Sequence, residues 1–270
     1  MLAAVDWHVV WERLFHPDHA FAQALWTTVY IAVAAQVLGV VLGLIAALMR
    51  MSKLGVMRAL SGAYVLVFRG TPLLVQIFFM YYGANLLFGP GFFFGHDLIP
   101  TTAHFGLFSL DGAVLAGILA LGFNEGAYMR EMIRAGIDAI EKGQMEAARS
   151  LGMTYGLAMR RIVLPQAARV IVPPLGNEFN AMIKNTSLVF TIGVLEMFSD
   201  AEIRNSTTFQ PVEIFGAVAV WYLVLTTVWT VIQAQIERKL AVSERGDELS
   251  FWDRLVEAWT PVEAWARGAR

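Results

Sequence analysis

The sequence contains no cysteine, which excludes disulfides, thiolate nucleophiles and thiolate-bound metal ions. It has five histidines, all outside the strongest apolar stretches, and we expect no metal site. It also lacks a G-x-x-x-x-G-K-[ST] phosphate loop, a G-x-S-x-G nucleophile motif and an H-E-x-x-H zinc motif. We therefore predict that this chain carries no catalytic residues.

Charged residues are scarce as well. They make up 16% of the 270 residues, against about a quarter in a soluble domain, whereas hydrophobic residues make up 57%. This balance is typical of a protein that crosses a membrane several times. The formal net charge of −2 gives no positive surplus for binding nucleic acid.

Five apolar stretches are long enough to cross a bilayer, which takes about 20 residues. They cover roughly residues 21–49, 60–84, 110–133, 166–188 and 214–236. The fourth is the weakest, and a linker at 196–211 separates it from the fifth. We predict an all-α membrane protein in which residues 21–240 form one transmembrane domain of five helices.

Basic residues predict the orientation, because they are more frequent at the cytoplasmic ends of spans. Nearly all of the 20 lysines and arginines fall on one side if residues 50–58, the loop 134–165 with its flanks, and the chain from 237 onward are cytoplasmic. Only Arg13 and Arg204 fall on the other side, while Arg69 and Lys184 lie inside predicted spans. We expect the N-terminus outside and the C-terminus in the cytoplasm.

The two ends of the chain flank these spans. Residues 1–20 place Trp7, Trp11 and Phe15 at helical spacing, which predicts an amphipathic helix on the periplasmic membrane surface; a disordered tail is the alternative. Residues 241–270 form a cytoplasmic tail. Its aromatic residues could lie on the inner membrane surface or on a partner, or the tail could be a dispensable extension.

The most polar long stretch is 146–165, EAARSLGMTYGLAMRRIVLP. Residues 146–151 favour a helix, Gly152 interrupts it, and a second helix with Arg160 and Arg161 begins near Gly156. The stretch lies between the third and fourth spans, on the predicted cytoplasmic side. A polar helix in this position predicts contact with a partner protein.

This stretch also resembles a named signature. Glu-Ala-Ala, then Gly after three residues, then Ile-x-Leu-Pro after nine more, is similar to the EAA motif of permease subunits of ABC importers. In that family the first helix of the loop, here around 141–155, is a coupling helix that docks on the ATP-hydrolysing subunit. The matching residues are Glu146, Ala147, Ala148, Gly152, Leu164 and Pro165.

Further stretches resemble the polar amino acid permeases of the histidine/glutamine type. They are residues 68–76 (FRGTPLLVQ), 124–134, 173–179 (PPLGNEF) and 184–188 (KNTSL). The outer loop at 88–108 and the tail after 241 depart from the pattern.

The resemblance implies the transmembrane domain of a type I ABC importer in the bacterial inner membrane. It also implies a second permease subunit, two ATPase subunits that hold ATP and magnesium, a periplasmic or surface-tethered solute-binding protein, membrane lipid and an amino acid substrate. No cofactor is expected on this chain.

Polar residues inside the spans suggest a substrate site, because they are costly there. A zwitterionic amino acid needs donors for its carboxylate and acceptors for its ammonium, and this set offers both. The alternative is that these residues pair with one another or form a dimer contact. The candidates are Asn177, Glu178, Asn180, Lys184, Asn185, Glu125 and Arg69.

Two further predictions concern the surroundings of these residues. Pro173 and Pro174 are expected to break the fourth helix just before the polar face and to free backbone groups for a ligand. Arg69 could be structural, pairing with Glu125 or Glu178.

The sequence leaves a second function open. A self-sufficient secondary transporter or channel could use Arg69, Glu125, Glu178 and Lys184 as an ion or proton relay. Against it, five spans offer no even inverted repeat. The identity of the amino acid and the choice between homodimer and heterodimer stay open.

Overall fold

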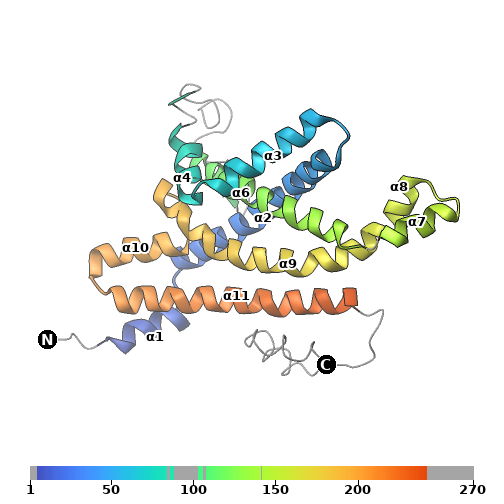
Figure 1. Cartoon of the computed structure of the whole chain (residues 1–270). Coiled ribbons are helices and arrows are strands. Elements are labelled where there is room, and N and C mark those ends of the chain that lie inside the picture. Colours follow the sequence, from blue (N-terminus) through green and yellow to red (C-terminus); the bar gives the residue numbers. More distant parts are fainter. Residues whose placement is uncertain (1–4, 84–85, 88–102, 106–107, 141, 242–270) are drawn as a thin grey trace.

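The computed structural model describes residues 5–83, 86–87, 103–105, 108–140 and 142–241 (Figure 1). Most of these residues lie in helices. The helices are α1 (Trp7–Phe15), α2 (His19–Met51), α3 (Gly55–Gly70), α4 (Leu73–Phe78), η1 (Phe79–Gly83), α6 (Gly112–Asp138), α7 (Lys142–Ser150), α8 (Tyr155–Ala158), η2 (Met159–Val163), α9 (Leu164–Asn185), η3 (Thr186–Ile192), α10 (Met197–Thr208) and α11 (Pro211–Ala241).

Two short strands interrupt this helical chain. β1 (Ala103–Phe105) and β2 (Phe108–Leu110) pair antiparallel, with His104 opposite Ser109. They lie between the second and third predicted spans, and the all-α prediction did not include them.

Within the described part of the chain, three helices are each long and apolar enough to cross a membrane: α2, α6 and α11. Two further candidates are bent pairs. α3 meets the α4–η1 segment at 107°, and the continuous helix from Tyr155 to Ile192 meets α10 at 51°. The residues that the structure describes therefore hold three such helices, or up to five if each bent pair is one span.

Acidic side chains fix where two long helices begin. The Asp18 carboxylate accepts a hydrogen bond from the Phe21 backbone N–H at 2.9 Å, and Asp111 accepts one from Val114 at 2.8 Å. A capping carboxylate satisfies a backbone donor that has no partner within the helix. These two caps set the starts of α2 and α6.

α2 and α6 pack closely because glycines line their contact. A Cβ added to Gly43 would lie 2.3 Å from the Cβ of Met129, and Gly39 is similarly crowded. Gly122 and Gly126 make the same close approach from α6. Each helix thus carries two small residues four positions apart, a pattern that lets membrane helices approach to backbone contact.

The main hydrophobic core lies where several helices meet. Its buried residues include Ile31 of α2, Ile77 of α4, Leu121 of α6, Met182 of α9 and Val189 of η3. The bent α3–α4 segment and the α9–η3 helix are therefore fixed against the α2–α6 pair.

α9 runs without a break, so the predicted break at Pro173 and Pro174 is wrong. Both prolines lie inside the helix, although a proline removes one backbone hydrogen bond. α11 supports α9 at this level: Gln233 Nε2 donates to the Pro173 carbonyl at 3.2 Å, and Trp229 Nε1 donates to the Gly176 carbonyl at 2.7 Å. A neighbouring helix can thus keep a proline-containing membrane helix intact.

The predicted linker at 196–211 is also wrong, because it contains α10. Glu196 caps this helix by accepting from the Ser199 backbone N–H at 2.8 Å. The segment is polar and lacks a clear apolar period, which is why we predicted no helix there.

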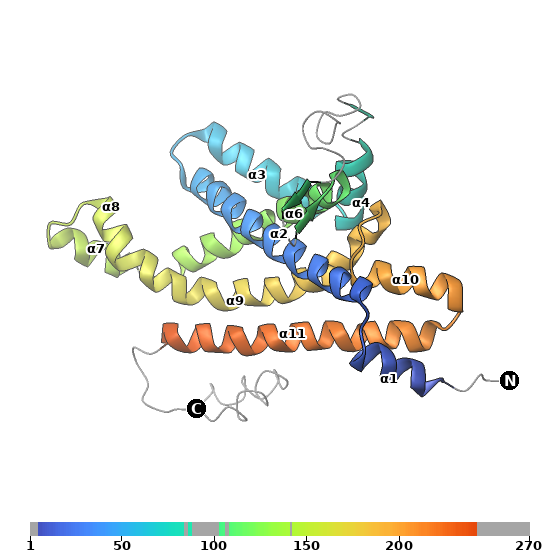
Figure 2. The same ribbon diagram turned by 180° about the vertical axis from the view of Figure 1, so that it is seen from behind.

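α1 is a helix, as one of the two alternatives for residues 1–20 predicted. It lies beside the first turns of α11 in both views (Figures 1 and 2). Trp221 Nε1 donates to the Arg13 carbonyl at 3.3 Å. The other face is open, with Trp7 74% and Trp11 61% exposed.

Candidate functional site

The segment 146–165 forms a helical hairpin at one end of the molecule (Figures 1 and 2). α7 packs against η2, and between them the chain turns at Gly152, whose φ is +82°. Glycine adopts this left-handed conformation without the strain that a side chain would bring. Thr154 Oγ1 then accepts from the Leu157 backbone N–H at 3.4 Å and starts α8. The predicted helix, turn and helix are all present.

The second helix of the hairpin does not stop at Pro165. α8, η2 and α9 follow one another without a gap, so one helix extends from Tyr155 to Ile192. Pro165 lies in the first turn of α9, where a missing N–H does little harm. The second helix of the hairpin is thus continuous with the helix that carries Asn177 to Asn185.

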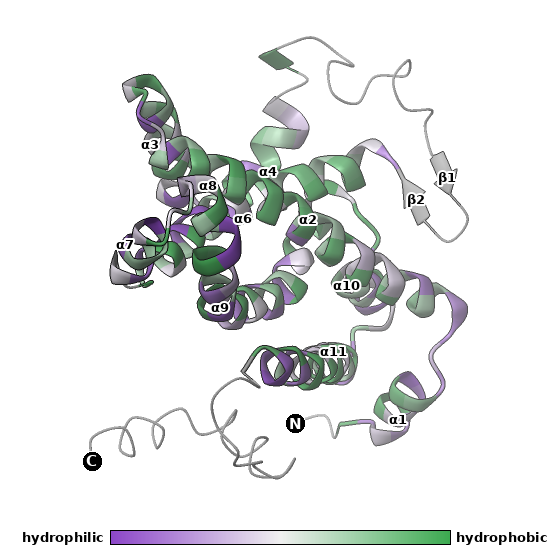
Figure 3. Cartoon of the chain, turned by 90° about the vertical axis from the view of Figure 1, so that its right-hand side faces the viewer, coloured by the Kyte–Doolittle hydropathy of each residue, from purple (hydrophilic) through white to green (hydrophobic). Residues whose placement is uncertain are grey.

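The tip of the hairpin is exposed. Glu146 and Ala147 lie on the surface, whereas Ala148 is buried. Leu151 is 84% exposed, and Tyr155, at the start of α8, is 58% exposed. Figure 3 shows hydrophilic residues gathered around α7, while α2 and α4 are largely hydrophobic. Exposed apolar residues among polar ones suit a contact with another protein.

Two of the candidate substrate residues contact α11. Gln233 Nε2 donates to Asn177 Oδ1 at 3.3 Å, and Asn180 Nδ2 donates to Thr230 Oγ1 at 3.4 Å. Gln233 also donates to Glu237 at 2.8 Å. This face of α9 therefore includes a hydrogen-bonded seam with α11, in line with the alternative in which the polar residues pair with neighbours.

Three other candidates lie on the same helix. Lys184 is exposed, and Glu178 and Asn185 are partly buried. Among the residues that the structure describes, none of the three takes part in an ion pair.

Glu125 belongs to another helix, α6, and is buried against α2. Gln36 Nε2 donates to its Oε1 at 3.2 Å, and a Cβ on Gly39 would lie 2.5 Å from its Cγ. Gly39 thus makes room for the carboxyl group, and Gln36 supplies its hydrogen bond.

Among the described residues, Arg69 makes no direct ion pair with Glu125 or Glu178, so the structure does not show the predicted pairing as a contact. Its guanidinium instead lies over the ring of Tyr128, 4.9 Å from the centroid. Arg69 sits at the end of α3, just before the 107° bend, and its side chain is exposed. It therefore offers a positive charge on an open surface within the predicted second span.

The sequence did not single out Glu196, which is fully buried. Its Oε2 accepts from the hydroxyl groups of Tyr222 at 2.9 Å and Thr28 at 3.4 Å. One carboxyl group thus joins α2, α10 and α11. The signal that could have revealed it is a lone acidic residue in the apolar sequence VLEMF.

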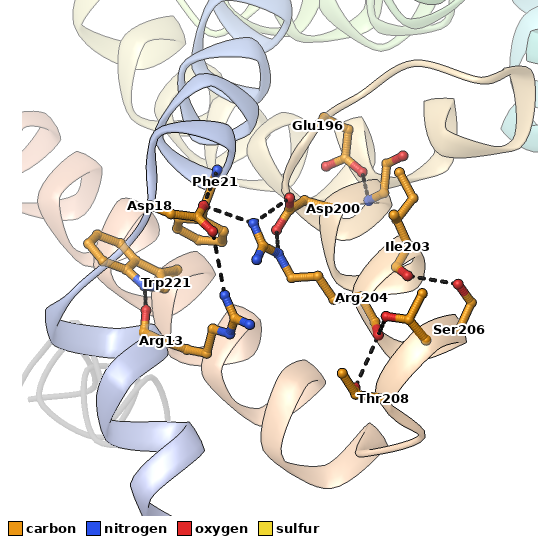
Figure 4. A network of polar contacts seen from close by, with 12 residues as sticks. Arg13, Asp18, Phe21, Glu196, Asp200, Ile203, Arg204, Ser206, Thr208 and Trp221 are labelled. Atoms are coloured by element: carbon orange, nitrogen blue, oxygen red, sulfur yellow. Dashed lines mark hydrogen bonds and ion pairs between the residues drawn. The ribbon is translucent and has the colours of Figure 1, made fainter.

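A charged cluster closes the opposite end of the molecule from the hairpin (Figure 4). Arg204 donates to Asp200 and Asp18, with the Asp18 contact at 2.8 Å, and Arg13 lies 3.6 Å from Asp18. The hydrogen bond from Arg204, followed by that from the Phe21 backbone, holds the pKa of the Asp18 carboxyl below its ordinary value of 3.8. The cluster ties α1 and the start of α2 to α10.

Comparison with known proteins gives one matching family. The family described as binding-protein-dependent transport system inner membrane component matches residues 39–242. Two curated relatives are similar over most of the chain. The probable amino-acid permease protein YxeN of Bacillus subtilis is 37% identical over 86% of this chain and 96% of its own length. The arginine transport system permease protein ArgU of Corynebacterium glutamicum is 37% identical over 96% of this chain and 79% of its own.

Solved structures are similar too. An amino acid ABC transporter crystallised with histidines matches with a TM-score of 0.69 and 36% identity, over 82% of this chain and 94% of that one. The MetNI methionine ABC transporter, in an inward-facing conformation, matches with a TM-score of 0.65 at 16% identity, over 82% of this chain and 96% of that one. The second likeness concerns the fold alone.

Proposed function

The chain belongs to the family of binding-protein-dependent transport system inner membrane components, and on this premise we propose that it is the permease subunit of an ATP-driven importer of polar amino acids. Its relatives are named for amino-acid and arginine transport, which supports this substrate class. The single observation that carries the mechanism is the exposed hairpin built from the EAA-like segment.

The hairpin is the joint to a separate ATPase. Its exposed Glu146, Ala147 and Leu151 suit docking on a protein surface, and Gly152 permits the tight turn that presents them. Leu164 and Pro165 lie at the start of α9. A shift of the hairpin would therefore be carried directly into the helix that holds Asn177 and Lys184.

We propose five spans, with the two bent pairs counted as one span each. The N-terminus is outside and the C-terminus in the cytoplasm. The arrangement supports this orientation, because the α2–α3 loop, the hairpin and the last turn of α11 lie toward one end, and α1 and α10 toward the other (Figure 1). The basic loops thus gather on one side, as they do at the cytoplasmic face of membrane proteins.

The complex comprises two permease subunits, two ATPase subunits and a solute-binding protein, in a bacterial inner membrane. ATP and magnesium belong to the ATPase partner. Closure of the ATPase dimer brings the hairpins together and opens the path outward, and release of hydrolysis products returns it inward. α1 lies at the outer membrane surface, where its tryptophans meet lipid.

The substrate site proposed within the membrane uses charges of both signs. Arg69 and Lys184 are exposed and can bind a carboxylate, while Glu178 can bind an ammonium group. Asn185 lies beside Lys184, whereas Asn177, Asn180 and Glu125 already have hydrogen bonds to α11 or α2. We therefore assign Arg69, Lys184 and Glu178, with Asn185, to substrate contact. The three residues with hydrogen bonds to α11 or α2 shape the path.

The experiment that tests this function is reconstitution in liposomes. The chain is combined with candidate ATPase and binding-protein partners, and ATP hydrolysis and amino acid uptake are measured together. Uptake that requires ATP hydrolysis is expected. Uptake by the chain alone, driven by an ion gradient, would instead support the secondary transporter.

A further inference from the structure

The bend between α3 and α4 leaves backbone carbonyls without partners in either helix. α3 ends at Gly70, and Thr71 and Pro72 are extended, with ψ of 148° and 136°. The last carbonyls of a helix lack intrahelical donors, and within a membrane no bulk water replaces them. Something in the protein has to satisfy the carbonyls at this bend.

Two amide side chains do so. Gln76 Nε2 lies 2.8 Å from the Phe68 carbonyl oxygen, 3.0 Å from that of Thr71 and 2.8 Å from Thr71 Oγ1. Asn124 Nδ2 donates to the same Phe68 carbonyl at 2.9 Å and to Gln76 Oε1 at 3.0 Å. The two amides therefore support each other and hold the end of α3.

The same stretch of α6 also contacts Arg69. Tyr128 lies one helical turn after Asn124, and its ring lies under the Arg69 guanidinium. Asn124 thus fixes the carbonyl just before Arg69 while Tyr128 supports its side chain. Within the described residues no carboxylate forms an ion pair with Arg69. The direction of the Arg69 side chain therefore depends on the bend and on the contact with Tyr128.

The geometry points to Gln76 and Asn124 as positioning residues that hold the α3–α4 bend and so present Arg69 to the transport path. What Arg69 recognises there, the carboxylate of an amino acid, rests on the proposed function. The bend itself depends only on the hydrogen bonds described above.

The absence of cysteine allows a direct test. In the full-length chain in membrane vesicles, Arg69→Cys is labelled with a water-soluble methanethiosulfonate reagent, with and without Gln76→Leu. Gln76→Leu is expected to shift the labelling rate by about tenfold, because it removes the donor that the Phe68 and Thr71 carbonyls share. Gln23→Leu, the same change on an exposed face of α2, should leave the rate unchanged.

A second variant guards against misfolding. Asn124→Ala leaves the bonds between Gln76 and residues 68 and 71 intact, and it should shift the labelling rate in the same direction but less. Normal labelling in both variants, at normal membrane levels of the chain, would overturn the assignment.

Transport kinetics separate this inference from the proposed function. Gln76→Leu is expected to raise the KM for amino acid uptake about tenfold, with a smaller effect on maximal rate, and Arg69→Ala should add little in the same chain. If the two effects multiply instead, Gln76 does not act through Arg69. If labelling shifts but no amino acid is transported, the proposed function fails while the positioning role stands.

Discussion

At the residue scale, single glycines decide how closely α2 and α6 approach. Gly39, Gly43, Gly122 and Gly126 lie where another side chain or backbone atom occupies the place of a Cβ. Lipid gives little driving force for helix association, so van der Waals contact at such positions contributes much of the stability of the pair. The position of each glycine along its helix therefore matters more than the number of glycines.

We predict that Gly43→Ala destabilises the chain by about 1–3 kcal/mol, because overpacking forces backbone shifts. Gly62→Ala is the matched control, since a Cβ there meets nothing within 4 Å. That substitution should be neutral or slightly stabilising, because alanine favours helix. The midpoint of thermal unfolding of the detergent-purified chain measures both, and equal midpoints would contradict the packing argument.

A pH prediction concerns Asp18. Because the pKa of its carboxyl is lowered in the folded chain, its charge stabilises the fold above the ordinary value of 3.8, and this contribution is lost as the pH falls through the lowered pKa. Asp18→Asn keeps the helix cap, since asparagine caps as well as aspartate. It removes the charge that Arg204 contacts.

The loss from Asp18→Asn should be at most about 1 kcal/mol, because an exposed ion pair is screened by solvent, and the Asp18 side chain is 49% exposed. The difference in unfolding midpoint between the two chains should be constant from pH 7 to about pH 5 and shrink below about pH 4. A difference that grows on acidification would refute it.

At the element scale, the α7–α8 hairpin depends on one turn. Its sequence predicted its structure well, because Gly152 and the flanking helix-forming residues act locally. The prolines of α9 and the helix α10 were harder to predict. Their structure is set by partners distant in sequence, Gln233 in the first case and Thr28 with Tyr222 in the second.

Gly152→Ala should uncouple the hairpin from its ATPase, because a left-handed conformation costs a residue with a Cβ about 1–2 kcal/mol. The expected result is a loss of about five- to thirtyfold in substrate-stimulated ATP hydrolysis by the reconstituted complex. Gly152→Trp should detach the ATPase more fully while the chain still inserts.

Gly156→Ala serves as the control for that turn. Gly156 lies in α8 without a positive φ, and a Cβ there meets nothing within 4 Å. Normal ATP hydrolysis is expected from this variant. Normal hydrolysis by Gly152→Ala as well would remove the turn from the coupling mechanism.

At the scale of the whole molecule, hydrophobicity and length predicted the three helices α2, α6 and α11, which are long and apolar enough to cross a membrane. These two properties did not predict the 107° bend or the seam between α9 and α11. These features arise because polar side chains such as Gln76, Asn124 and Gln233 bind backbone carbonyls across helices. Tertiary packing decides which carbonyls these side chains bind, and the sequence composition does not reveal those pairs. Residue type likewise identified the candidate substrate residues. Only the structure shows which of them are hydrogen-bonded to a neighbouring helix, as Asn177, Asn180 and Glu125 are.

The orientation can be measured with single cysteines in this cysteine-free chain. Ser206→Cys in α10 should react with a membrane-impermeant thiol reagent in intact cells. Ser150→Cys in α7 should react only after the membrane is opened. Both positions are exposed, so burial does not confuse the comparison, and the reverse labelling pattern would refute the proposed topology.

The long helix from Tyr155 to Ile192 has a mechanical consequence. At 1.5 Å per residue it extends roughly 30 Å from the hairpin to the level of Gly176 and roughly 25 Å beyond. Trp229 and Gln233 donate hydrogen bonds to its backbone at that level. Two prolines there lack the backbone N–H, so α11 stabilises the helix where its own hydrogen bonding is weakest. η3, at the far end, is held in the main core, where Val189 and Ile192 are buried. A tilt imposed at the α8 end would therefore be transmitted along α9 to the level where α11 and the core hold the helix.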